Sequence, residues 1–251
     1  MPRVMDMAER DILLSANDVA VSFGALHVLR GLDFSVRAGE LVGVVGPNGA
    51  GKTTLFSILV GALRPDSGTV SFEGAEITGL SMPKRCRRGL VRTHQVPRPF
   101  NGMTVFENVL VAAANGGEGY RDAAQQRALE ALSFTDMLRQ SNRLAESLGL
   151  LDRKRLELSR ALATDPKVLL LDEIGGGLTE GESARLLDMI LALNAHGISI
   201  VWVEHVVPLL TRAVARLVCL HQGTIIADGS PGEVMTDPAV AEAYLGLGGR
   251  T

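Results

Sequence analysis

The sequence predicts an α/β fold in which a parallel sheet is joined by an antiparallel β layer and an inserted helical subdomain. Three short runs, residues 41–45, 168–171 and 198–203, are apolar at consecutive positions, as expected of strands covered on both faces. Helix-like segments alternate with these runs. Residues from about 101 to 160 have helical spacing and contain no strand-like run. We therefore expect a single domain spanning residues 1–251.

The composition is that of an ordinary globular protein. Of 251 residues, 46% are hydrophobic and 21% are charged, and the net charge of -3 favours neither nucleic acid nor acidic lipid. Cys86 and Cys219 belong to no CxxC pair or His/Cys cluster, so neither a disulfide framework nor a zinc site is predicted. No signal-peptide core is present, and no run approaches the roughly 18 apolar residues of a membrane span. We expect a chain of the reducing cytoplasm that must dock on a membrane protein if it acts at a membrane.

The first part of the chain predicts the antiparallel β layer and one helix. Segments 11–23, 32–39 and 68–74 alternate polar and apolar residues, as strands with one covered face do. After Lys52, apolar residues recur at helical spacing, and we expect this helix to run up to the turn sequence RPDSG at 64–68.

The last part of the chain predicts a long helix and a hairpin. Thr179-x-x-Glu182 has capping-box spacing and begins a helical segment that ends before Gly197. Residues 218–229 form a predicted hairpin that turns at Gln222-Gly223, and we assign it to the antiparallel layer.

These elements divide the single domain into three parts, the first of which is made of two segments. We place the core with its β layer at about 13–95 and 161–230, and the helical subdomain at about 96–160. Residues 231–251 form the C-terminal tail, whose Gly-rich end LGLGGRT is expected to fray.

The strongest chemical motif is GPNGAGKT, which matches the G-x-x-x-x-G-K-[ST] phosphate loop between a predicted strand and a predicted helix. Glycines let successive N–H groups curl around phosphate oxygens, and the helix N-terminus favours anions. Lys52 would neutralise the β and γ phosphates, and Thr53 would hold Mg²⁺. A Gly-rich turn with a chance GKT is the alternative, which the flanking elements disfavour. The predicted nucleotide-binding residues are Gly46, Pro47, Asn48, Gly49, Ala50, Gly51, Lys52, Thr53 and Thr54.

Polar residues also follow the two other buried strands. Asp172 and Glu173 come directly after 168–171, at the edge where ligands gather in open α/β sheets. Asp172 is suited to Mg²⁺, and Glu173 is suited to orienting or deprotonating the water that attacks the γ phosphate. His205 follows 198–203 and reaches the same edge, although a lone histidine is more often structural.

The order GPNGAGKT, Gln95 in RTHQ, LLLDE and His205 resembles the nucleotide-binding domains of ABC transporters, from about Leu13 to Gly246. The resemblance implies the ABC ATPase fold with a P-loop NTPase core, and a chain that hydrolyses ATP with Mg²⁺ as one half of a two-nucleotide sandwich. It implies that Phe23 stacks on adenine, and that Gln95 touches Mg²⁺ and the attacking water. It also implies that His205 is the switch histidine at the γ phosphate. The catalytic residues would be Glu173, His205 and Gln95, and the metal ligands Thr53, Gln95 and Asp172.

Three segments point to a subgroup: RTHQVPRPFNGMTVFENVLVA, RKRLELSRALAT and GSPGEVMTDPAVAEAYLG are similar to ATP-binding subunits of branched-chain amino-acid importers. Such importers also carry other small amides and acids. The resemblance implies permease subunits docked near residues 96–109, an external solute-binding protein, and a peripheral position on the cytoplasmic face of the inner membrane. It leaves the identity of the solute open.

One departure from the family concerns its signature, LSGGQ, which lines up with Leu148-Gly149-Leu150-Leu151-Asp152 and lacks the Ser and the second Gly. A helix start there would still offer backbone donors and a dipole to an anion. Leu151 adds bulk where the family has none, which hinders closure of a sandwich of two identical chains. A second ATPase with a better signature would remove this obstacle. The sequence leaves both a homodimer and a heterodimer open. Ile174 stands where proline is common, and we expect little chemical effect.

Other functions fit these motifs less well. A P-loop kinase would not need Gln95, the signature-like helix and His205, and an ATP sensor without turnover would not need Glu173 with His205. DNA-repair ABC proteins usually carry zinc cysteines or long coiled coils. The basic run Lys84, Arg85, Arg87, Arg88, Arg92 and Arg98 could suggest nucleic acid. Because no aromatic residues interleave with it, we interpret the run as a solvated face near phosphates and headgroups, and expect no nucleic-acid partner.

Overall fold

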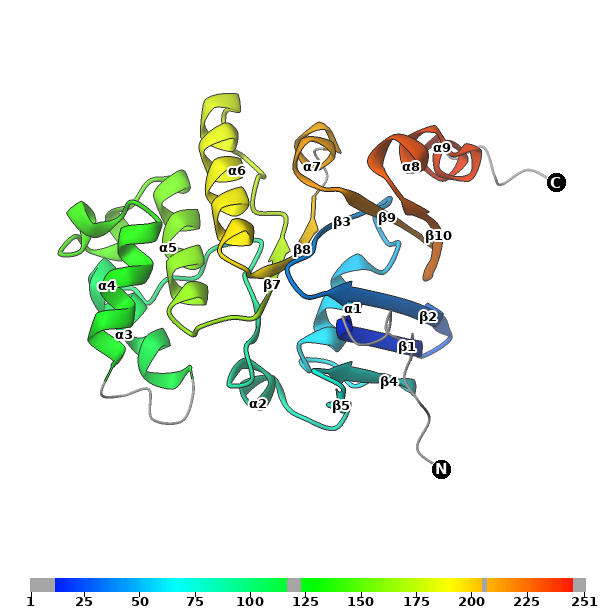
Figure 1. Ribbon diagram of the computed structural model, residues 1–251, viewed down its shortest axis with the longest axis horizontal. Coiled ribbons are helices and arrows are strands. Elements are labelled where there is room, and N and C mark those ends of the chain that lie inside the picture. The colour runs from blue at the N-terminus through cyan, green and yellow to red at the C-terminus, as the bar shows by residue number, and fades with distance from the viewer. Residues whose placement is uncertain (1–11, 117–122, 205–206, 246–251) are drawn as a thin grey trace.

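The computed structural model describes residues 12–116, 123–204 and 207–245, and contains two sheets (Figure 1). The six-stranded sheet has the order β10 (Thr224–Gly229), β9 (Arg216–His221), β3 (Leu41–Val45), β8 (Ser199–Val203), β7 (Val168–Asp172), β6 (Leu90–Arg92). All its neighbours pair in parallel except β10 with β9. The three apolar runs thus lie side by side as β3, β8 and β7, as predicted, and every residue of these three strands is buried.

The second sheet is antiparallel and has the order β2 (Leu26–Arg37), β1 (Ile12–Phe23), β4 (Ser67–Phe72), β5 (Ala75–Glu76). The predicted hairpin forms, but its assignment to this layer is wrong. Leu217, Val218, Cys219 and Leu220 are all buried, so β9 is covered on both faces and extends the parallel sheet beside β3.

The turn of this hairpin joins three parts of the molecule. Gln222 and Gly223 both have positive φ, at 45° and 84°, as a two-residue hairpin turn requires. The Gly223 N–H donates to the Ala50 carbonyl at 3.0 Å, and its carbonyl accepts from the Arg30 N–H at 3.1 Å. A Cβ at Gly223 would lie 2.3 Å from the Val28 carbonyl oxygen, so only glycine fits here.

Helix α1 (Lys52–Leu59) packs between the two sheets and is shorter than predicted. Gly61 has a φ of 76°, which ends the helix before the expected turn. The guanidinium of Arg85, from α2 (Met82–Cys86), donates to the last carbonyls of α1, those of Ile58 and Leu59. Arg85 is 1% exposed, so its assignment to a solvated basic face is also wrong.

Helices on the other face of the six-stranded sheet are α6 (Glu180–Ala195), α7 (Val207–Ala213), α8 (Pro231–Thr236) and α9 (Pro238–Leu245). The predicted capping box of Thr179 and Glu182 begins α6. The described part of the C-terminal tail is therefore helical, while LGLGGRT lies outside the described residues except Leu245.

A third group is helical and has its own apolar cluster. It contains α3 (Val105–Asn115), α4 (Ala124–Phe134), α5 (Leu150–Leu162) and the short 3₁₀ turns η2 (Leu138–Gln140) and η3 (Ala145–Ser147). In Figure 1 these helices gather on the left, away from the antiparallel sheet. None of the described helices is long and apolar enough to cross a membrane.

Candidate nucleotide-binding site

The phosphate loop joins the C-terminal end of β3 to the N-terminus of α1, as the sequence predicted. Gly46 and Gly51 have φ values of 147° and 108°, and a Cβ at Gly46 would lie 2.1 Å from the Leu220 carbonyl oxygen. The loop can therefore press against β9 only because it carries glycines. Asn48 and Gly49 are exposed at its tip. The result is a loop whose backbone leads directly into the positive end of a helix, the usual arrangement for binding phosphate.

The Lys52 side chain lies inside this loop. It is 6% exposed, and its Nζ donates to the carbonyls of Gly46 at 2.7 Å and Pro47 at 3.1 Å. Burial lowers the pKa of Lys52, while the nearby carboxylates of Glu173 and Asp172 oppose this shift. The ammonium group is thus hydrogen-bonded to the loop carbonyls and is close enough to Asp172 and Glu173 to be influenced by their charge.

Those acids end β7. Asp172 is 3% exposed, and its Oδ2 accepts from Arg92 Nη2 at 2.5 Å. Glu173 has a φ of 49°, a left-handed conformation that is rare outside glycine and concentrates at functional sites. The Gln95 side-chain amide donates to the Glu173 carboxylate. The structure therefore brings Gln95 and Glu173 together, although they lie 78 residues apart in the sequence.

The predicted magnesium ligands offer oxygen atoms only: the Thr53 hydroxyl on the first turn of α1, the Gln95 amide and the Asp172 carboxylate. Among the described residues, no group of three or more His, Cys, Asp or Glu could hold a metal by itself. A set with one carboxylate and one hydroxyl fits Mg²⁺ that completes its shell with phosphate oxygens and water.

Phe23 and His205 are the remaining predicted site residues. Phe23 ends β1 with 54% of its surface exposed, beside the turn to β2, so its ring is free to meet a flat base. Its stacking on adenine stays a prediction. His205 lies outside the described residues. Glu204, directly before it, is 2% exposed and accepts from the Gly175 N–H and from Trp202 Nε1.

Sequence reasoning missed two residues that touch the site. Tyr244 Oη, on α9, accepts from the Gly46 N–H at 2.8 Å, so the C-terminal helix reaches the start of the phosphate loop. Arg92 pairs with Asp172, so its assignment to a solvated basic face is wrong, since the side chain is only 15% exposed. Its position at the end of an apolar pair, Leu90 and Val91, was the available signal of a short strand.

The signature-like segment begins α5. Gly149 is its N-cap, with no side-chain cap bond, so backbone N–H groups are presented at a helix start, as expected. Leu150, in the place of the first signature glycine, is 45% exposed and is a further departure from the family signature.

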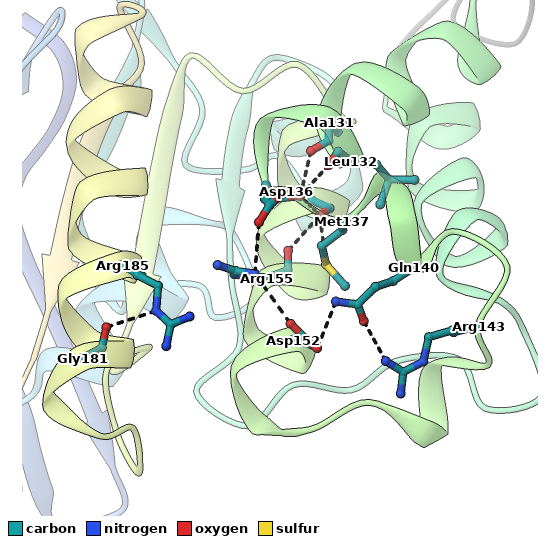
Figure 2. A network of polar contacts seen from close by, with 12 residues as sticks. Ala131, Leu132, Asp136, Met137, Gln140, Arg143, Asp152, Arg155, Gly181 and Arg185 are labelled. Atoms are coloured by element: carbon teal, nitrogen blue, oxygen red, sulfur yellow. Dashed lines mark hydrogen bonds and ion pairs between the residues drawn. The ribbon is translucent and has the colours of Figure 1, made fainter.

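A polar network fixes the first turn of this helix (Figure 2). Asp152 lies 3.7 Å from Arg155 and accepts from Gln140 Nε2 at 3.0 Å. Arg155 also pairs with Asp136 at 3.7 Å, and Arg143 donates to Gln140 at 3.2 Å. Asp152 therefore makes these contacts with neighbours inside the helical group.

Comparisons with known proteins agree with this geometry. The profile of the family described as ABC transporter matches residues 29–175, and that of the branched-chain amino acid ATP-binding cassette transporter matches residues 224–248. The chain is 36% identical to the high-affinity branched-chain amino acid transport ATP-binding protein LivG of Salmonella typhimurium, covering 93% of this chain and 98% of the relative. It is 34% identical to BraF of Pseudomonas aeruginosa, with the same coverage.

Solved structures give the same result. The ADP conformation of an ATP-binding cassette of an ABC transporter superposes with a TM-score of 0.85 and 31% identity, covering 94% of this chain and 99% of that chain. The dimeric, post-hydrolysis structure of an ATP-binding cassette bound to ADP and Pi, at 22% identity and a TM-score of 0.77, covers 87% of this chain and 99% of that chain and shares the fold. This chain belongs to the ATP-binding cassette family of ABC transporters, as an ATP-hydrolysing subunit similar to those of the branched-chain amino acid group.

Proposed function

We propose that this chain powers an importer of branched-chain amino acids or related small amides and acids, from the cytoplasmic face of the inner membrane. The observation that carries the hydrolytic part is the contact of Gln95 with Glu173, beside Lys52. The C-terminal match to the branched-chain group, together with the names of the relatives, supports the solute class.

The proposed reaction is in-line attack of water on the γ phosphate. Lys52 exchanges its loop carbonyls for phosphate oxygens and offsets their charge. Glu173 accepts a hydrogen bond from the water and polarises it, while Gln95 holds that carboxylate in place. His205 keeps its predicted role at the γ phosphate.

Magnesium would be held by Thr53, Gln95 and Asp172. When bound, it would neutralise charge on the β and γ phosphates. The chain would contribute fixed oxygen donors on two rigid elements, the first turn of α1 and the end of β7.

We infer that the permease docks in a groove of about 370 Å³ beside the Gln95 segment. Its lining includes Val60, Met82, Cys86, Arg87, His94 and Asn115. Met82 is 46% exposed, and the lining residues His94 and Asn115 lie on either side, in the sequence, of the segment 96–109 that the family resemblance assigns to docking. An apolar helix end with an acidic residue would suit this mixed lining.

A docking test uses Met82→Asp in the tagged chain expressed in its native membranes. We expect permease subunits to co-purify with the parent and with the control Met235→Asp, an exposed methionine on α8, but not with Met82→Asp. Equal recovery of permease with both variants would reject the groove. An external solute-binding protein in the same system stays part of the proposal.

The working unit is proposed to be a sandwich of two ATPases, each supplying a signature helix to the other's nucleotide. The exposed Leu150 and the bulk of Leu151 favour a second, different ATPase.

The catalytic assignment is tested with Glu173→Gln, which should still bind ATP but lose most of its ATP hydrolysis. The exposed control Glu130→Gln should hydrolyse ATP like the parent. Equal turnover in Glu173→Gln and the parent would reject the catalytic assignment.

Size-exclusion chromatography with light scattering on Glu173→Gln then tests the sandwich itself. An ATP-dependent dimer that is absent in ADP would show that Gly149, Leu150 and Leu151 still allow closure. A monomer in both nucleotides would mean that another ATPase or the permease completes the site.

A further inference from the structure

Arg92 occupies a central position behind the nucleotide site. It ends β6, the edge strand that pairs in parallel with β7, and stands three residues before Gln95. Its guanidinium lies 5.7 Å from the centre of the Phe56 ring on α1. The side chain therefore bridges the two elements, β7 and α1, that bear Asp172 and Thr53.

The guanidinium contacts Asp172 directly and is linked to Thr53 through the Ser57 hydroxyl. Nη2 donates directly to Asp172 Oδ2 at 2.5 Å. Nη1 donates to Ser57 Oγ at 3.1 Å, and Ser57 Oγ donates to the Thr53 carbonyl at 2.7 Å. One side chain thus connects the Asp172 carboxylate with the backbone of Thr53.

The contacts require the shape of arginine. The planar guanidinium carries its N–H donors on separate nitrogens in a fixed fork, here Nη1 toward Ser57 and Nη2 toward Asp172, whereas lysine carries all its donors on one nitrogen. Arg92 Nε is buried without a hydrogen-bond partner, a cost to the folded protein. The other two nitrogens both donate, to Asp172 and to Ser57, so these two hydrogen bonds define how the guanidinium is oriented.

We propose that Arg92 is a positioning residue of the magnesium site, an inference that rests on the proposed function. It fixes the rotation of the Asp172 carboxylate and, through Ser57, the first turn of α1 with Thr53. Groups that orient metal ligands in this way typically contribute about 10- to 100-fold to metal affinity. The positive charge also balances Asp172 before the nucleotide and its metal arrive.

The test measures metal binding rather than turnover. Mn²⁺ serves as the probe, and its affinity for the chain saturated with ADP is determined by electron paramagnetic resonance. Arg92→Lys keeps the charge but loses the fork, and we expect Mn²⁺ affinity to fall about ten-fold. Ser57→Ala removes only the Thr53 branch, and a fall of about two- to five-fold is expected. Arg88→Lys, an exposed arginine on the turn before β6, is the matched control and should equal the parent.

Affinity for ADP in EDTA separates positioning from a general loss of structure. It should be unchanged in Arg92→Lys; an equal loss with and without metal, or Mn²⁺ affinity equal to that of Arg88→Lys, would overturn the inference. If Arg92→Lys does not fold, the Mn²⁺ affinity of Ser57→Ala serves as the test. An affinity equal to that of the parent would then overturn the inference. A parent that binds Mn²⁺ no better than ADP alone does would instead reject the proposed metal site.

Discussion

Replacing Arg85 with methionine should destabilise the protein strongly, because this side chain satisfies backbone carbonyls that are buried or partly buried. Its nitrogens donate to four carbonyls, those of Ile58, Leu59, Thr78 and Leu80, at 2.7–3.0 Å. Methionine fills a similar volume but donates nothing. The Arg85→Met variant therefore isolates the loss of hydrogen bonds from the loss of packing.

The magnitude follows from the carbonyls left behind. Ile58 O also accepts from the Gly61 N–H at 3.1 Å and so retains a partner. The other three carbonyls lose the Arg85 donors, at about 1 kcal/mol or more each for a buried unsatisfied group. Burial lowers the pKa of Arg85 to about 10, so its removal also relieves the desolvation of a cation. We expect a net loss of about 3 kcal/mol.

The assay is urea unfolding followed by tryptophan fluorescence. Trp202 is the one tryptophan of the sequence and is fully buried on β8, so it reports on the core sheet. Lys84→Met, at the exposed neighbouring position on α2, is the control and should unfold like the parent. A loss below about 1 kcal/mol in Arg85→Met, with an unchanged denaturant slope, would refute the reasoning.

Other predictions address the site and the helix ends. Lys52→Ala should weaken binding of a fluorescent ATP analogue more than ten-fold, about 1.4 kcal/mol or more, and parent-like affinity would contradict its placement. Phe23→Ala should weaken ATP by about 1–3 kcal/mol without changing inhibition by tripolyphosphate, which carries no base. Thr179→Ala, which removes the cap of α6, should cost about 1 kcal/mol in thermal unfolding, and an unchanged melting temperature would contradict this. Burial raises the pKa of Glu204 in the folded protein. The stability that protonated Glu204 contributes is therefore fully present below the unfolded pKa of about 4.3, and it is lost as the pH rises through the higher folded pKa. The Tm of Glu204→Gln minus that of the parent should therefore increase with pH in that window, and a constant difference would contradict the burial argument.

The sequence was sufficient for the elements whose surroundings are uniform. Buried parallel strands such as 168–171 are apolar at every position, so they are visible without knowledge of their neighbours. The phosphate loop and the cap of α6 are local motifs and were also found. The hairpin at 218–229 was misassigned because its turn was given more weight than the apolar run from Leu217 to Leu220.

Contacts between distant residues were not predictable from any local pattern. Arg92 meets Asp172 across 80 positions, and Tyr244 meets Gly46 across 198. Arg85 lies in a run of basic residues that composition assigns to the surface, yet it is buried against carbonyls. Such pairings depend on the sheet order, which a single sequence does not specify.

The turn at Gly223 affects the distance between the place proposed for the base and the place proposed for the phosphates. Through backbone hydrogen bonds, it ties Arg30 of the sheet that carries Phe23 to Ala50 of the phosphate loop. If base and phosphates bind at these two places, the span between them is set by main-chain geometry and not by adjustable side chains. Surface changes elsewhere on either sheet would then leave the length of the accepted ligand unaltered, whereas lengthening this one turn would change it.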